Sequence, residues 1–108
     1  MLRISIRHVR KDQVERLRTW FAEVNQRLDE VRETFVQEGV HHEQAFLLEG
    51  KDGPILIYAV EAEDPVRARL AFQHSQLPID HEHARVMAQV IAGGVDAELL
   101  YECRLETK

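Results

Sequence analysis

Residues 42–61 read HEQAFLLEGKDGPILIYAVE, and this stretch decides the fold. Two runs rich in apolar residues, 42–49 and 54–61, flank a Gly-Lys-Asp-Gly sequence at 50–53, which is typical of a hairpin loop. The second run is apolar on both faces, as expected of a central strand or one whose second face is covered by a partner. The sequence therefore predicts an antiparallel hairpin in the middle of the chain.

The residues before the hairpin predict a strand followed by a helix. Residues 2–9 alternate, with Leu2, Ile4 and Ile6 on the face expected to be buried. Residues 12–39 carry apolar side chains at steps of three and four, which predicts one long amphipathic helix. Asp12 and Glu15 have the spacing of a capping box, and Gly39 is a natural end. The heptad-like seam leaves a coiled coil as an alternative, which the flanking strands disfavour.

The residues after the hairpin predict a second helical region and a last strand. Asp64-Pro65 is a helix start, the apolar pattern weakens at Ser75, and Pro78-Ile79-Asp80 restarts the helix with Asp80 as its cap. Gly93-Gly94 is expected to end it, and the alternation of residues 96–105 predicts a strand. The order βαββαβ, with its second helical region split in two, predicts a ferredoxin-like α+β fold: a four-stranded antiparallel sheet with helices on one face.

Size and charge restrict the class of protein. The chain has 108 residues, so we expect a single domain over 1–108. Its net charge is −5 and it lacks a basic cluster, which argues against nucleic acid and anionic membranes as partners. A lone cysteine, Cys103, excludes an internal disulfide. The sequence shows no signal peptide and no apolar span of about 18 residues, so we predict a cytoplasmic protein.

The face without helices is expected to carry both charges and large apolar groups. We assign to it alternate residues of the first and last strands: Arg3, Ser5, Arg7, Glu98, Leu100, Glu102 and Arg104. A slip of one residue exchanges the two sets of each middle strand, and we favour Glu43, Leu47 and Tyr58 on the open face. So much apolar surface predicts that a second copy covers this face in a homodimer.

Several strings resemble an uncharacterised domain-of-unknown-function family within the dimeric α/β-barrel superfamily. They are Glu38-Gly39-Val40 before Glu43 and Phe46-Leu47, Asp64 at the second helix, and Ser75-x-x-Pro78-Ile79-Asp80-x-x-His83. The resemblance covers nearly the whole chain. It implies a homodimer with a pocket in each half, and it assigns no catalytic residue, because that family has no agreed reaction. The wider superfamily includes cofactor-independent monooxygenases, polyketide cyclases, sugar mutarotases, haem degraders and stress proteins, so a shared fold does not choose among them.

Three residues are candidates for catalysis. His83 is a candidate general acid or base, because the ordinary pKa of histidine lies near neutrality, and Asp80 is a candidate to orient it. The alternative is that Asp80 only caps the helix. Glu43 in a half-buried pocket is expected to have a raised pKa and to move protons beside Tyr58.

Ligand contacts are expected from Arg7, Asp80 and Glu102, with Arg7 suited to an anionic group. The alternative is that Arg7, Glu43 and Glu102 form cross-strand ion pairs at a dimer interface. We predict no metal and no cofactor, because His81 and His83 diverge by about 200° on a helix. Metal or haem at His74, His81 or His83 stays a minor alternative.

Two functions fit these observations. The first is a homodimer that binds a small organic molecule in a pocket on the open sheet face and supports cofactor-free acid/base or monooxygenase-like chemistry. The second is a non-enzymatic stress or accessory dimer that uses this face only for assembly. The sequence leaves open whether the protein is an enzyme.

Overall fold

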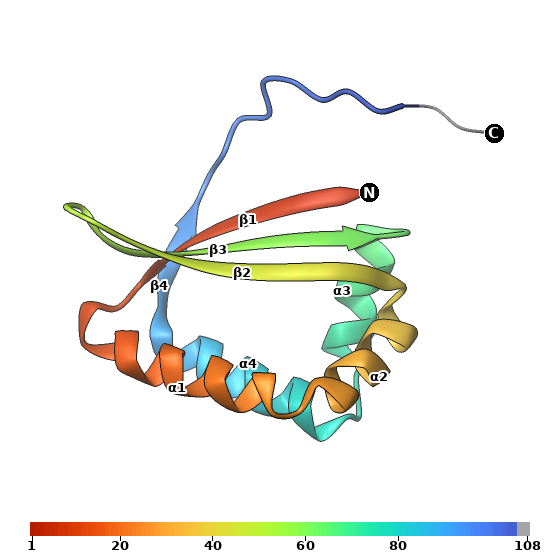
Figure 1. Cartoon of the computed structure of the whole chain (residues 1–108), viewed down its shortest axis with the longest axis horizontal. Coiled ribbons are helices and arrows are strands. Elements are labelled where there is room, and N and C mark those ends of the chain that lie inside the picture. Colours follow the sequence, from red (N-terminus) through yellow and green to blue (C-terminus); the bar gives the residue numbers. More distant parts are fainter. Residues whose placement is uncertain (106–108) are drawn as a thin grey trace.

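The computed structural model describes residues 1–105 and shows one sheet with helices on one side of it (Figure 1). The elements in chain order are β1 (Leu2–Val9), the short 3-10 helix η1 (Lys11–Gln13), α1 (Val14–Asn25), α2 (Leu28–Glu38), β2 (Val40–Gly50), β3 (Gly53–Ala62), α3 (Pro65–Gln73), α4 (Pro78–Val90) and β4 (Ile91–Val95). The four strands are antiparallel and lie in the order β2-β3-β1-β4, which is the ferredoxin-like arrangement. The predicted fold class is confirmed.

The central hairpin forms where the sequence predicts it. β2 and β3 pair from Gly50 opposite Gly53 to Val40 opposite Ala62. Gly53 has a φ of 103°, a left-handed conformation that glycine adopts without steric cost. The register shifts between Val40 and His42, which leaves His41 as the extra residue of a bulge.

The prediction of one long first helix is wrong, because the helix breaks at Gln26–Arg27 into α1 and α2. The Arg27 guanidinium lies in the break and binds Glu23, Glu30 and, across to α4, Glu82 at 2.7 Å. The apolar period continues through the break, so the pattern did not reveal it. The predicted capping by Asp12 is also wrong, because η1 precedes α1 and no side chain caps α1.

The second helical region is split into α3 and α4, as predicted. The Asp64 carboxylate accepts hydrogen bonds from the backbone N–H groups of Val66 and Arg67, which confirms its capping role. Asp80 is not a cap, contrary to prediction. Leu77 occupies the cap position, and Asp80 lies buried in the first turn of α4.

The last strand is shorter and earlier than predicted. β4 follows α4 directly and contains Gly93 and Gly94, which pair with His8 and Arg7 of β1. The glycine pair therefore belongs to a strand, because the backbone already leaves the helical conformation at Ile91. Residues 96–105 form no helix or strand and extend away from the sheet on the side opposite the helices (Figure 1).

The two faces of the sheet are exchanged relative to prediction. Leu56 is 2% exposed and packs in the core with Leu17 and Trp20 of α1, so its face is the helix-facing side. Tyr58 and Val60, two and four residues after Leu56 on β3, point to the same side, and so do the residues opposite these three on the neighbouring strands. Those residues are Arg7, Ser5 and Arg3 on β1 and Leu47, Ala45 and Glu43 on β2. The predicted assignment of Glu43, Leu47, Tyr58 and the arginines to the open face is therefore wrong by one residue.

The open face carries most of the exposed apolar side chains of the sheet. Leu2, Ile4, Phe46 and Leu48 are each 51–54% exposed, and Ile6, Ile55 and Ile57 lie among them half-buried. From the alternation of residues 2–9, we predicted that Leu2, Ile4 and Ile6 would face the helices. Val9, Leu56 and the helices fill the core instead. Among the described residues, no helix is both long and apolar enough to span a bilayer.

Candidate functional site

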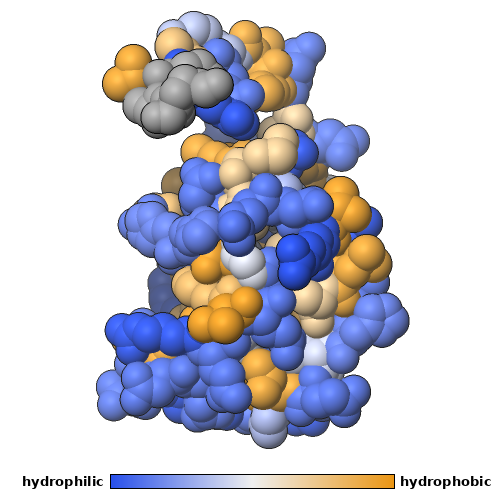
Figure 2. Space-filling view, turned by 90° about the vertical axis from the view of Figure 1, so that its right-hand side faces the viewer, coloured by the Kyte–Doolittle hydropathy of each residue, from blue (hydrophilic) through white to orange (hydrophobic). Residues whose placement is uncertain are grey.

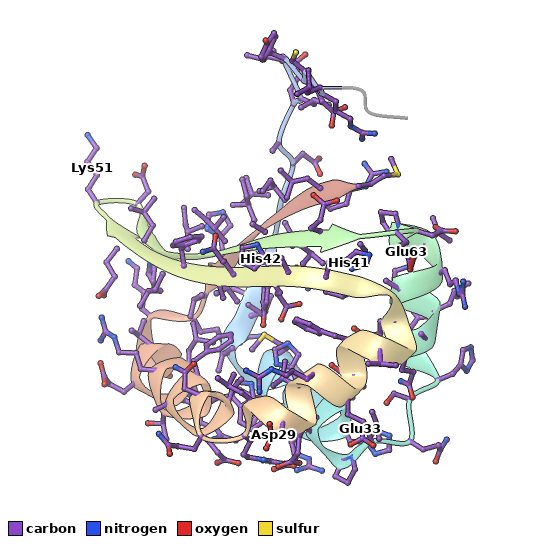
Figure 3. All side chains as sticks on the ribbon, turned by 45° about the vertical axis from the view of Figure 1, so that its right-hand side comes forward. Asp29, Glu33, His41, His42, Lys51 and Glu63 are labelled. Carbon is purple, nitrogen blue, oxygen red and sulfur yellow. The ribbon has the colours of Figure 1, made fainter. Side chains whose placement is uncertain are left out.

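Five side chains from four elements gather between the sheet and the helices. We call them the site cluster: Glu38 at the end of α2, Glu43 on β2, Tyr58 on β3, and Asp80 and His83 on the first turns of α4. β2 and β3 present Glu43 and Tyr58 toward the helices because both residues share the face of Leu56. Figure 3 shows side chains of both layers pointing into the space beneath β2.

His83 is fixed by hydrogen bonds at both ring nitrogens. The indole N–H of Trp20 donates to Nδ1 at 2.9 Å, and Nε2 lies 3.2 Å from the Tyr58 hydroxyl oxygen. An indole nitrogen only donates, so Nδ1 must accept and Nε2 carries the proton of the neutral ring. Nε2–H therefore donates to Tyr58, and the Tyr58 hydroxyl keeps its own hydrogen for another acceptor.

Aromatic rings surround His83. The ring centroids of Trp20, Phe21, Tyr58 and Phe72 lie 6.0–6.3 Å from that of His83. Burial lowers the pKa of His83 to about 4, so the ring is neutral at neutral pH. The reason that suggested His83 as a general base, an ordinary pKa, therefore does not hold. Its geometry is that of a residue that positions Tyr58.

We expect His83 to stay neutral, as the Nε2–H tautomer, from pH 9 down to about pH 5. Burial and the Trp20 hydrogen bond both favour the uncharged ring with a free lone pair on Nδ1. Imidazole ¹⁵N chemical shifts across this range check the expectation, with a His83→Gln variant to assign the signal. A protonation midpoint between pH 6 and 7 would contradict it.

The three carboxyl groups of the site cluster, which we call the carboxyl cluster, are poorly compensated. Glu38 and Asp80 are only 9% and 7% exposed. Glu38 Oε2 and Asp80 Oδ2 are buried without a hydrogen-bond partner among residues 1–105. Glu43, on the edge strand β2, is exposed.

Desolvation shifts all three carboxyl groups toward the protonated form. Burial, and then repulsion from Asp80 and Glu43, raises the pKa of Glu38 to about 8. Burial and Asp80 raise the pKa of Glu43 to about 7. Burial also raises the pKa of Asp80, against a hydrogen bond from Ser75 and the charge of His81. A carboxyl group with a pKa near neutrality is suited to take and return a proton.

Tyr58 supplies a neutral donor on the same face of the sheet as Glu43. Burial, and then the charge of Glu43, raises the pKa of Tyr58, and Arg7 on β1 opposes the shift. Tyr58 therefore stays protonated at neutral pH. A base and a hydrogen-bond donor on one face are the groups that proton abstraction next to a carbonyl requires.

A groove of about 330 Å³ between α1 and β2 lies next to the site cluster. Its lining is mainly apolar, with two polar side chains, and consists of Leu17, Arg18, Phe21, Ala22, Asn25, Ala45, Phe46, Leu47 and Leu56. Ala45 is two residues from Glu43 on the same face of β2, a distance of about 7 Å along a strand. The ring of Phe21 lies 6.1 Å from that of Tyr58. An apolar group in the groove would therefore lie on the other side of Phe21 from Tyr58 or directly along that ring, close to the part of the site cluster that Tyr58 and His83 form.

The structure brings together most of the residues that the sequence singled out. Glu43, Tyr58, Asp80 and His83 meet in the site cluster. Arg7 lies on the same side of the sheet, opposite Leu56. Glu102 does not join them. It lies in the segment 96–105, exposed, with Arg104 as its partner at 3.4 Å.

The sequence did not predict that two further residues, Glu38 and Trp20, would lie at the site. Glu38 belongs to the Glu38-Gly39-Val40 string, which marked the resemblance but gave no sign that the side chain turns inward. Trp20 lies beside Phe21 on an apolar seam, and a seam does not show where an indole N–H points.

The chain was compared with known proteins. A family model described as a family of unknown function (DUF6176) matches residues 2–107. No curated protein matches the chain. Neither comparison assigns a residue of the site cluster to a reaction.

Proposed function

We propose that this chain, which belongs to the DUF6176 family of unknown function, binds a small carbonyl or phenolic compound between its sheet and its helices and moves a proton on it. One observation carries the proposal: Trp20 and His83 hold the Tyr58 hydroxyl on the sheet face that also presents Glu43, a carboxyl group with a pKa of about 7.

The roles follow from the protonation states. Glu43 takes the proton, because it is the carboxyl group of the site cluster that solvent reaches and its pKa matches neutral pH. Tyr58 donates to the oxygen on which negative charge develops. His83 and Trp20 position Tyr58 and do not change their own protonation.

We also propose that the protein is a homodimer joined through its open sheet face. Four large apolar side chains there are about half exposed, and sheets with such faces commonly pack against each other. The segment 96–105 adds Leu99, Leu100, Tyr101 and Leu105, each 75–92% exposed. Figure 2 shows apolar side chains on this segment, which stands clear of the body of the protein. A second copy would bury both surfaces.

The catalytic proposal is tested by ligand discovery followed by proton exchange. A thermal-shift screen of small carbonyl and phenolic compounds, read with native mass spectrometry, selects ligands. We expect the purified protein to exchange acidic C–H protons of a carbonyl ligand with D₂O, followed by ¹H NMR. Glu43→Gln is expected to slow this exchange by about 10²- to 10⁴-fold, and Tyr58→Phe by about 10²-fold or more.

Glu33→Gln is the matched control, because Glu33 is an exposed glutamate on α2 (Figure 3). It should leave the exchange unchanged. Ligands that bind without any exchange would overturn the catalytic role and leave a binding protein. A screen without ligands, on a protein that proves dimeric, would favour the accessory dimer.

A further inference from the structure

We infer that the ligand carries a protonated amino group, which the buried oxygens of Glu38 and Asp80 bind. This inference rests on the proposed function and specifies its substrate class: a small organic cation with an apolar body.

The buried oxygens of Glu38 and Asp80 are the first argument. Both side chains are more than nine-tenths buried, and each leaves one oxygen without a hydrogen-bond partner among residues 1–105. Buried polar groups in proteins almost always have partners, because an unpaired one costs free energy. An ammonium group offers three N–H donors and a compensating charge, so it suits two such oxygens.

The surrounding charges are the second argument. α2 contributes Glu38, β2 contributes Glu43, and α4 contributes Asp80 beside the neutral His83. The positive groups that act here are Arg7 on Tyr58 and His81 on Asp80. Within residues 1–105, no arginine or lysine forms an ion pair with any member of the carboxyl cluster. An ammonium group bound there would supply the ion pair that the carboxyl cluster lacks.

A metal ion is a poorer occupant than an organic cation. In the part of the chain that the structure describes, no group of three His, Cys, Asp or Glu is arranged to hold a metal. A bound metal needs several ligand atoms that converge on one point. An ammonium group has three N–H donors of its own and needs only acceptor oxygens, which do not have to converge on one point. The rest of an amine ligand is hydrocarbon, which the groove can bury.

The groove sets the shape of that hydrocarbon. Its lining includes Phe21, whose ring lies 6.1 Å from that of Tyr58 and 6.3 Å from that of His83. The groove volume of about 330 Å³ accommodates a phenyl ring with a short alkyl chain. 2-Phenylethylamine is therefore a suitable probe, with 2-phenylethanol and phenylacetate as matched neutral and anionic probes.

Isothermal titration calorimetry of the full chain with these three probes tests the inference. We expect 2-phenylethylamine to bind about 10- to 100-fold more tightly than 2-phenylethanol, which is the range for losing a charged hydrogen bond. We expect no binding of phenylacetate. Glu38→Gln and Asp80→Asn should each remove most of the preference for the amine, and Glu33→Gln should retain it.

The pH dependence gives a second readout. An ammonium group binds ionised carboxylates, so its binding must displace the proton that Glu38 holds below pH 8. Amine affinity should rise from pH 6.5 to 8.5, by up to about tenfold per pH unit, and 2-phenylethanol affinity should not.

Equal affinities for the amine and the alcohol would overturn the inference, as would an unchanged preference in both folded variants. If carbonyl ligands bind but none of the three probes does, the inference fails and the proposed function stands. If no compound of either set binds, both fail.

Discussion

Replacing Phe46 by Glu is expected to convert a dimer into a monomer, with the solution mass falling by half to that of one 12.6 kDa chain. Phe46 is 51% exposed on the open face of β2, where Leu48 is similarly exposed. A carboxylate at this position would lie between two sheets without a partner, and burying an unpaired charge costs several kcal/mol, roughly 3–5. Analytical ultracentrifugation of the wild type and Phe46→Glu measures the change.

Val36→Glu is the matched control for this prediction. Val36 is 86% exposed on α2, in the helical layer, so the same change there adds a carboxylate without touching the open face. This variant should sediment as the wild type does. A wild type that sediments as a single chain at high concentration would refute the dimer outright.

The register separates the dimer interface from the site. The site cluster lies on the helix-facing side of the sheet, and Phe46 lies on the other side. Phe46 is also among the residues that line the groove, so Phe46→Glu tests the dimer and not the binding of 2-phenylethylamine.

The exchanged faces show what alternation leaves undetermined. Leu2, Ile4 and Ile6 predict a strand with one apolar face, and this is confirmed. The pattern does not say whether that face meets the helices or another sheet. Leu56 decides it, because its burial against Trp20 fixes every side chain paired with it. That contact joins residues far apart in the sequence, so no local period encodes it.

The site cluster was predictable in part. Glu43, Tyr58, Asp80 and His83 were identified from residue type and resemblance, and they meet. Their protonation states were not predictable. The low pKa of His83 comes from burial among rings of α1, α3 and β3. The raised pKa of Glu38 comes from burial and from Asp80, a residue of another helix.

Glu38→Gln is expected to make the protein more stable at alkaline pH, because it removes a carboxylate that folding must bury. The ordinary pKa of this glutamate, 4.5, describes the unfolded chain, and in the folded protein it is about 8. Below pH 4.5 both states hold the proton and no difference arises. Between pH 4.5 and 8 the unfolded chain has released the proton while the folded protein keeps it, so the free energy of unfolding falls as pH rises. Above pH 8 the loss is complete.

The expected loss at pH 9 is about 2–4 kcal/mol, somewhat below the full value of the pKa difference. Urea unfolding at pH 6 and pH 9, at one fixed protein concentration, measures it. The fluorescence of Trp20, the only tryptophan, reports the transition. The wild type and Glu33→Gln should both lose stability between the two pH values, and Glu38→Gln should lose much less. The slope that remains belongs to Glu43 and Asp80, whose pKa values are raised in the same direction. His83, whose pKa is lowered, acts only toward acid pH, where protonation of the unfolded chain destabilises the fold. Equal stability of the wild type at pH 6 and pH 9 would show that Glu38 is not buried as the structure has it, and would remove the basis for an amine at the carboxyl cluster.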